Sequence, residues 1–349
     1  MRKNKDNTKL GFKNYYTLTD GLKVFFYAII LSIVMSLVIT ILFTIVASIM
    51  GMGFYEFTAI QLGRYLMVIA MSVAYLVLYF VYNKKNKVQN FSTLNLKTKV
   101  NPLVLVFSIV LAVACVFLFE PITSLILDGL SAIGFKVEGD LTYQMDTWWR
   151  VILGIIAYAL LPAFAEEVLF RGVVQKGYAG RCTAFCTIFM STASFVIMHG
   201  SLQQFVYQIV LGIVLSCLAY YMGSVLYSMV FHFVNNLTVV VISLVGAPRY
   251  MEEGFYYLGK FWGYFLPFVF MLVGAGLIVL LVWILRIQYK KTNNTDVTIE
   301  GDNIIIEEQE TRLTLKNLSS KIYLQEKLYF YLGWVSAVVI WVINTLGYF

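Results

Sequence analysis

Residues 160–172 read LLPAFAEEVLFRG, an apolar run that holds two adjacent carboxylates, Glu166 and Glu167, followed by Arg171. On a helix, Glu167 and Arg171 stack on one face, with the acid before the base, and can neutralise each other in an apolar setting. Glu166 points about 100° away from this pair. A carboxylate in apolar surroundings with no cation beside it is a candidate general base. The alternative is a structural ion pair at a membrane interface, with Glu166 merely solvated.

The composition around this run is that of an integral membrane protein. The 349 residues are 60% hydrophobic and 13% charged, with a mean hydropathy of +0.78, whereas soluble domains are about half apolar and a quarter charged. A helix of about 20 apolar residues spans the hydrocarbon core. The sequence therefore predicts an all-α, polytopic transmembrane helical bundle of eight or nine membrane helices, at 24–50, 62–82, 102–120, 148–171, 182–199, 204–221, 225–246, 262–286 and 328–348.

The basic residues indicate how the chain is threaded through the membrane. The N-terminal segment 2–23 and the loop 84–99 are rich in lysine, whereas the segment 121–146 is mainly acidic. Loops rich in Lys and Arg stay in the cytoplasm, which predicts a cytoplasmic N-terminus and an outer location for 121–146. The net charge of +7 is explained by this topology. We expect the lipid bilayer and no nucleic acid as a partner.

The chain contains only two histidines, and both lie in apolar segments. His199 follows Phe195 by one helical turn, and His232 precedes Asn236 by one turn. An imidazole and an amide on one helix face can point two N–H donors at one oxygen, as a tetrahedral oxyanion requires, whereas Asn235 lies on another face. The alternatives are a histidine that merely bonds a backbone carbonyl and polar side chains that hold membrane helices together.

Three motifs, in this order, resemble those of the CAAX-protease and bacteriocin-processing (CPBP/Abi) intramembrane proteases, which are related to type II CAAX prenyl endopeptidases. They are Glu-Glu-x-x-x-Arg at 166–171, Phe-x-x-x-His at 195–199 and His-x-x-x-Asn at 232–236. The resemblance covers roughly residues 145–246. It implies a glutamate-type peptidase whose active site lies inside the membrane.

The resemblance also implies four catalytic residues and three supporting ones. Glu166 would activate water together with His199, and His232 and Asn236 would hold the oxyanion. The supporting residues would be Glu167, Arg171 and Phe195.

Two histidines and a glutamate could also bind zinc, through Glu166, His199 and His232. The sequence contains no HExxH motif, and the three candidates come from separate predicted helices. We therefore expect no cofactor and keep a zinc-dependent form of the same protease as an alternative.

Glu166 and His199 can meet only if the helix from Trp148 continues past Arg171 towards Gly180, where glycines would end it. The boundary at 171 is therefore expected to be too early. The chain divides into N-terminal membrane helices (1–120), a CPBP/Abi-like catalytic core (145–246), a membrane helix (262–286), a polar cytoplasmic segment (289–327) and a C-terminal membrane helix (328–349). Within the polar segment, residues 297–310 could form a short strand or remain disordered.

We expect a multi-pass protease of the bacterial cell membrane that hydrolyses a membrane-associated or leader-type peptide, or a membrane protein. The resemblance implies leader peptides, pheromone precursors or bacteriocin-related peptides as bacterial substrates and prenylated CAAX proteins as the eukaryotic ones. The rival hypotheses are a non-enzymatic bacteriocin-immunity or scaffold protein and a transporter-like binder. A transporter should show broken helices in two related halves, and the sequence shows no such symmetry.

Overall fold

The computed structural model describes residues 15–53, 61–136, 147–244, 260, 263, 265–294 and 312–347. Within these ranges, eight helices are long and apolar enough to cross a membrane, and a further apolar helix, Ala184–Met198, is shorter. The prediction of an all-α polytopic bundle is confirmed, and the chain is a multi-pass membrane protein.

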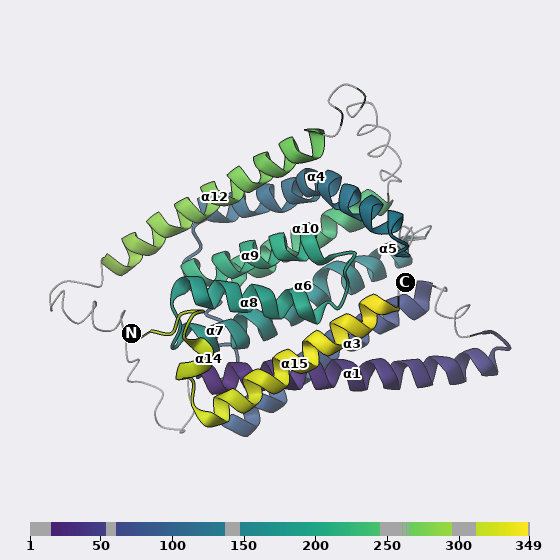
Figure 1. Cartoon of the computed structure of the whole chain (residues 1–349), viewed down its shortest axis with the longest axis horizontal. Coiled ribbons are helices and arrows are strands. Elements are labelled where there is room, and N and C mark those ends of the chain that lie inside the picture. The colour runs from purple at the N-terminus through teal and green to yellow at the C-terminus, as the bar shows by residue number, and fades with distance from the viewer. Residues whose placement is uncertain are drawn as a thin grey trace.

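The helices follow one another in the order shown in Figure 1. The first are α1 (Leu18–Ile49), α3 (Gln61–Asn86) and α4 (Pro102–Ala132). One continuous membrane segment then comprises α5 (Trp148–Gly154), η2 (Ile155–Leu160), α6 (Leu161–Glu166), η3 (Glu167–Val174) and α7 (Gln175–Ala179). After it come α8 (Ala184–Met198), α9 (Phe205–Met222), α10 (Leu226–Leu244), α12 (Phe265–Asn294), α14 (Leu318–Lys321) and α15 (Leu324–Leu346).

The predicted helix ends at 120, 171 and 286 are too early, and the helix expected at 262–286 continues to Asn294. The helix expected at 102–120 continues to Ala132, because apolar residues follow Pro121 and a membrane helix tolerates an internal proline. The helix expected to end at 171 continues to Ala179, which satisfies the condition for bringing Glu166 to His199. The stretch 297–310, the basic residues of 2–13 and the acidic residues of 138–146 lie outside the described residues.

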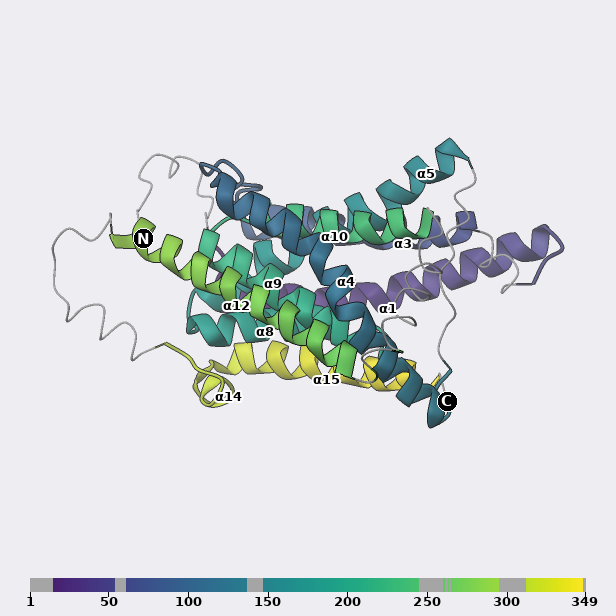
Figure 2. The same ribbon diagram turned by 90° about the horizontal axis from the view of Figure 1, so that it is seen from above.

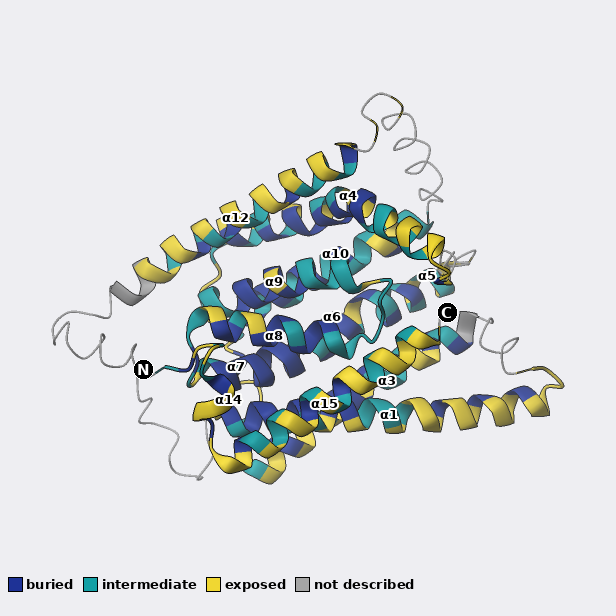
Figure 3. Ribbon diagram, in the orientation of Figure 1, coloured by how far each residue is buried: buried dark blue, intermediate teal, exposed yellow. Residues whose placement is uncertain are grey.

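The segment from α5 to α7 and helices α8, α9 and α10 form the centre of the bundle (Figure 1). Helices α1, α3 and α15 cover one side of this centre, and α4 and α12 cover the other. In the perpendicular view of Figure 2, α14 and α15 lie along one edge and α3, α5 and α10 along the opposite edge. Figure 3 shows that burial concentrates in the central helices, whereas the outer faces of α1, α12 and α15 expose apolar side chains. These exposed faces suit contact with lipid.

Glycine allows α1 to approach α7 closely at the core. A Cβ atom on Gly177 would lie 2.8 Å from the Cα of Gly21, and one on Gly21 would lie 3.0 Å from the carbonyl oxygen of Val174. Small residues let membrane helices pack backbone to backbone. This contact fixes the segment that carries the two glutamates against the N-terminal helix.

A polar clasp holds α15 to the central helices. Arg181, in the turn between α7 and α8, places Nη1 2.7 and 2.9 Å from the two carboxylate oxygens of Glu326. The Thr19 hydroxyl donates to the same carboxylate at 3.2 Å. Two backbone hydrogen bonds of 2.9 Å, from Thr183 to Leu313 and from Leu313 to Arg181, hold the segment before α14 against the same turn. A helix outside the predicted catalytic core is thereby fixed to it.

Replacing Glu326 by glutamine should weaken this clasp. The carboxylate is buried while Arg181 is partly exposed, so we expect the free energy of unfolding to fall by about 1.5–3 kcal/mol, the range for hydrogen bonds to charged groups. Thermal unfolding in detergent measures the change. Gln325→Ala, at the exposed neighbouring position, is the control, and equal melting temperatures for the two variants would contradict a stabilising clasp.

Candidate active site

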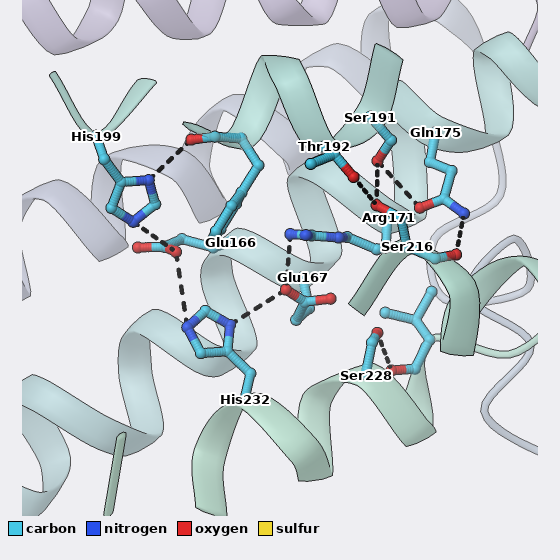
Figure 4. Close-up of polar contacts among 12 residues, drawn as sticks. Glu166, Glu167, Arg171, Gln175, Ser191, Thr192, His199, Ser216, Ser228 and His232 are labelled. Carbon is cyan, nitrogen blue, oxygen red and sulfur yellow. Dashed lines mark hydrogen bonds and ion pairs between the residues drawn. The ribbon is translucent and has the colours of Figure 1, made fainter. Parts of the chain in front are cut away.

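Three residues that are far apart in the sequence meet at the centre of the bundle. Glu166 is the last residue of α6, His199 directly follows α8, and His232 lies in α10. Figure 4 shows the Glu166 carboxylate between the two imidazole rings. Its Oε2 atom lies 3.8 Å from Nε2 of His199 and 4.0 Å from Nε2 of His232. The structure therefore brings these predicted site residues together.

Glu167 faces a different set of partners from Glu166. Its Oε1 atom accepts a hydrogen bond of 2.9 Å from Nη1 of Arg171, and the side chains of both residues are fully buried. The same oxygen lies 3.1 Å from Nδ1 of His232. A carboxylate paired with a guanidinium accepts hydrogen bonds, so His232 donates from Nδ1 and turns Nε2 towards Glu166. Glu167 thus neutralises Arg171 and orients one imidazole of the site.

His199 is oriented by its own helix. Its Nδ1 atom lies 2.8 Å from the backbone carbonyl oxygen of Phe195. A carbonyl oxygen can only accept, so Nδ1 donates and Nε2 is left to face Glu166. The Oε2 atom of Glu166 is itself buried and has no hydrogen-bond partner among the described residues. Both imidazoles therefore present Nε2 to one unpaired carboxylate oxygen.

The Phe195 ring packs against several members of the site. The guanidinium of Arg171 lies 4.3 Å from the ring centroid, at cation–π distance. The ring centroids of His199 and His232 lie 4.4 and 6.0 Å away, and that of Phe170 lies 5.7 Å away. The fully buried Phe195 ring therefore packs against both the ion pair and the two imidazole rings.

Replacing Phe195 by alanine should lower the free energy of unfolding by about 3–5 kcal/mol, the usual cost of truncating a buried phenylalanine. Thermal unfolding in detergent measures this loss. Phe189→Ala, on an exposed face of the same helix, is the matched control and should change the melting temperature little. Equal shifts for both variants would contradict the packing role of Phe195.

The glutamates lie at an irregular part of their helix. The α-helical turn that ends at Glu166 is flanked by π-helical segments, η2 before it and η3 after it. π-helical turns are rare and occur frequently at functional sites. The sequence argument assumed a regular helix and missed both segments, because no residue pattern in the run marks them.

Two cavities meet at Glu166 and His199. The smaller, of about 380 Å³, is lined on its polar side by Gln204, Tyr207, Gln208, Asn235 and Asn236. The larger, of about 750 Å³, is lined mainly by apolar residues of α1, α3 and α15. Sequence reasoning missed Tyr207 and Gln208, whose positions facing the site have no signature of their own. The carboxylate therefore faces both a polar and an apolar compartment.

The two adjacent amides of α10 have different surroundings, as the helical-face argument predicts. Asn235 is buried, and its Nδ2 atom donates to the carbonyl of Ala112 at 3.1 Å and to the Tyr207 hydroxyl at 2.7 Å. Asn236 lines the smaller cavity together with His232. Both amides line the smaller cavity, but Asn235 is held by its bonds to Ala112 and Tyr207 and ties α10 to α4 and α9.

A second buried polar network lies beside the ion pair (Figure 4). The Ser191 hydroxyl donates to Oε1 of Gln175 at 3.0 Å, and Nε2 of Gln175 donates to the carbonyl of Ser216 at 2.8 Å. The Ser216 hydroxyl completes the network by donating to Ser191 at 3.2 Å. These bonds join α7, α8 and α9 and give the network a structural role.

The Glu166 oxygen and the two imidazole nitrogens are spaced more widely than the ligand atoms of one bound zinc ion. Ligand atoms that each lie about 2.1 Å from one tetrahedral zinc are roughly 3.4 Å apart, whereas the two nitrogen–oxygen distances are 3.8 and 4.0 Å. Within the part of the chain that the structure describes, no group of three His, Cys, Asp or Glu side chains is placed to hold a metal ion.

Comparison with protein-family models matches residues 147–238 to the type II CAAX prenyl endopeptidase Rce1-like family. Comparison with curated proteins and with solved structures found no significant match. The matched segment begins just before α5 and ends within α10, so it includes the helices that carry both glutamates and both histidines. The resemblance predicted from the sequence is therefore confirmed over residues 147–238.

Proposed function

We propose that the chain is an intramembrane endopeptidase in which Glu166 activates water for attack on a peptide bond. The observation that carries the proposal is the buried Oε2 atom of Glu166, which makes no hydrogen bond within the described structure and faces Nε2 of both His199 and His232. The Rce1-like match over 147–238 supports a protease of this class. Because this oxygen makes no hydrogen bond within the described structure, its lone pairs are available to accept a proton from water.

In the proposed reaction, a water molecule lies between Glu166 and His199. The separation of 3.8 Å between the carboxylate oxygen and Nε2 is too long for a direct hydrogen bond and is of the kind that a water molecule bridges. The water oxygen attacks the peptide carbonyl carbon while Glu166 takes one water proton. As the carbon–nitrogen bond breaks, Glu166 returns this proton to the departing amine. His199 positions the water through Nε2.

In the proposed reaction, His232 and Asn236 stabilise the negative charge that develops on the carbonyl oxygen. Both residues line the smaller cavity beside Glu166, and two convergent N–H groups stabilise a tetrahedral oxyanion. Nδ1 of His232 is already bonded to Glu167. His232 can therefore donate to the oxyanion only from Nε2, with both ring nitrogens protonated.

The two cavities support a peptide substrate that has one apolar side and one polar side. The larger cavity, of about 750 Å³, has room for apolar side chains or an acyl chain, and the smaller cavity offers amide and hydroxyl groups to the peptide backbone. We propose a membrane-associated or leader-type peptide as the substrate and the bacterial cell membrane as the location. The N-terminus is proposed to be cytoplasmic.

Asn236→Ala is expected to lower kcat about 10²- to 10³-fold, the usual effect of removing one oxyanion donor, and to leave the melting temperature nearly unchanged. Its neighbour supplies a matched control. Asn235→Ala removes two hydrogen bonds of a buried amide and should lower the melting temperature more than Asn236→Ala does. Full activity of Asn236→Ala on a substrate that the wild type cleaves would contradict the oxyanion role.

A cleavage assay in detergent tests the proposed function. Wild type and Glu166→Ala are each incubated with a quenched peptide library, with and without a chelator. The proposal predicts cleavage by the wild type that persists with chelator and is lost in the variant. Loss of wild-type cleavage with chelator would favour the zinc-dependent alternative, and equal cleavage by both proteins would contradict the role of Glu166. The scaffold, immunity and transporter hypotheses predict that the variant keeps the function of the wild type.

A further inference from the structure

Helices α9 and α10 each line the smaller cavity with one face. The lining positions recur at intervals of three or four residues, the spacing that places side chains on one side of a helix. They are Gln204, Tyr207, Gln208 and Leu211 at the start of α9, and His232, Asn235, Asn236 and Val239 on α10. Glu166 belongs to the same lining. The cavity therefore joins the proposed general base to two largely polar helix faces.

Three buried oxygen atoms of this lining make no hydrogen bond within the described structure. They are Oε2 of Glu166, Oε1 of Gln208 and Oδ1 of Asn235. Among the described residues, the unpaired buried polar atoms of this lining are therefore all acceptors. Buried polar atoms are normally paired, because an unpaired one keeps the full cost of its desolvation. The lining thus favours an occupant that is rich in N–H donors.

The bonds of Asn235 fix which of its side-chain atoms is free. Asn235 is 1% exposed, and its Nδ2 atom lies 3.1 Å from the carbonyl oxygen of Ala112 and 2.7 Å from the Tyr207 hydroxyl. A carbonyl oxygen can only accept, so the atom that faces Ala112 is the nitrogen, and both of its hydrogens are used. Asn235 therefore has only the acceptor Oδ1 left for a ligand.

The three free oxygens belong to neighbouring side chains. Oε2 of Glu166 lies 4.0 Å from Nε2 of His232, and Asn235 follows His232 by three residues, on the same side of α10. Gln208 directly follows Tyr207, whose hydroxyl is bonded to Asn235. One carboxylate oxygen and two amide oxygens thus line a single cavity of about 380 Å³. They match the positive charge and the three N–H donors of a primary ammonium group.

We infer that the smaller cavity binds the free amino terminus of a peptide, whose N–H groups donate to Glu166, Gln208 and Asn235. The origin of this amino terminus rests on the proposed function. In that reaction Glu166 returns a proton to the departing nitrogen, so the new amino terminus forms at Glu166, in the cavity that holds the two amide oxygens. The bound group is then the amino terminus of the C-terminal product. Gln208 and Asn235 are specificity-determining residues for that side of the scissile bond.

Binding of trialanine amide to the purified protein in detergent tests the inference without any cleavage. N-acetyl-trialanine amide is the matched ligand control, because it keeps the main chain and lacks the ammonium group. Gln208→Leu removes the free acceptor, whereas Gln208→Glu keeps an oxygen at this position. Gln204→Leu is the control variant, since Oε1 of Gln204 already accepts a hydrogen bond of 3.4 Å from Gln208. Isothermal titration gives the dissociation constant of each pair.

The inference predicts that the wild type binds the free peptide about tenfold more tightly than the acetylated one, or tighter still, as hydrogen bonds to a charged group would give. Gln208→Leu should lose most of this preference, and Gln208→Glu and Gln204→Leu should keep it. Equal affinity of the wild type for the two peptides, or binding of neither, would overturn the inference. An undiminished preference in Gln208→Leu would also contradict it.

The titration also separates this site from the proposed function. A protein that prefers the free peptide and cleaves no peptide of the library would reject the proposed function and leave the amino-terminus site in place. A protein that cleaves peptides and binds both forms of trialanine amide equally would reject the site and leave the proposed function in place.

Discussion

Glu166→Gln is expected to lower kcat about 10²- to 10⁴-fold, the contribution of a positioned general base. The amide matches the carboxylate in shape and cannot take a proton from water. Since Oε2 of Glu166 makes no hydrogen bond within the described structure, the replacement breaks none and should leave the melting temperature almost unchanged. Steady-state cleavage of one identified peptide measures the loss of kcat.

Glu166→Asp is the control for this prediction. It keeps the carboxylate and moves it back by one methylene, so we expect more activity than in Glu166→Gln and less than in the wild type. A glutamine variant as active as the aspartate variant would show that the carboxylate does not act as a base.

Glu167→Ala is expected to lower the free energy of unfolding by about 3–5 kcal/mol, the cost of leaving one partner of a buried ion pair uncompensated. Arg171 is fully buried, and removing Glu167 takes away its ion-pair partner and leaves an electrostatic interaction with Glu166. The His232 ring would also lose the bond from Nδ1 that orients it. Thermal unfolding in detergent, with the wild type alongside, measures the loss of stability.

A double variant separates the ion pair from simple packing. Glu167→Met combined with Arg171→Leu removes both charges, and replacing a buried ion pair by apolar residues is often neutral. We therefore expect the double variant to be more stable than Glu167→Ala alone, although its activity should remain low because His232 is no longer held. A double variant no more stable than Glu167→Ala would contradict a coupled pair.

Much of the candidate site follows from the sequence, because ionisable residues are scarce in the apolar segments. With two histidines in the chain, His199 and His232 had few alternatives as partners of Glu166. The four-residue spacing of Glu167 and Arg171 predicted the ion pair, and the requirement that Glu166 meet His199 predicted the extension of the helix to Ala179.

Other features of the site depend on contacts that no spacing encodes. The hydrogen bond between Glu167 and His232 joins residues on separate helices and depends on the packing angle of these helices. The ion pair between Arg181 and Glu326 spans 145 positions of the chain. The π-helical turns on either side of Glu166 also escaped prediction, since they shift side chains away from the regular period on which sequence arguments rest.

The most direct test of the account compares the two adjacent glutamates in isosteric form. Glu166→Gln and Glu167→Gln are prepared in parallel, and the cleavage rate and the melting temperature of each are measured with one substrate. The account predicts that Glu166→Gln loses cleavage and keeps the wild-type melting temperature, whereas Glu167→Gln melts at a clearly lower temperature. Wild-type cleavage by folded Glu166→Gln would contradict the central claim that this carboxylate activates the attacking water.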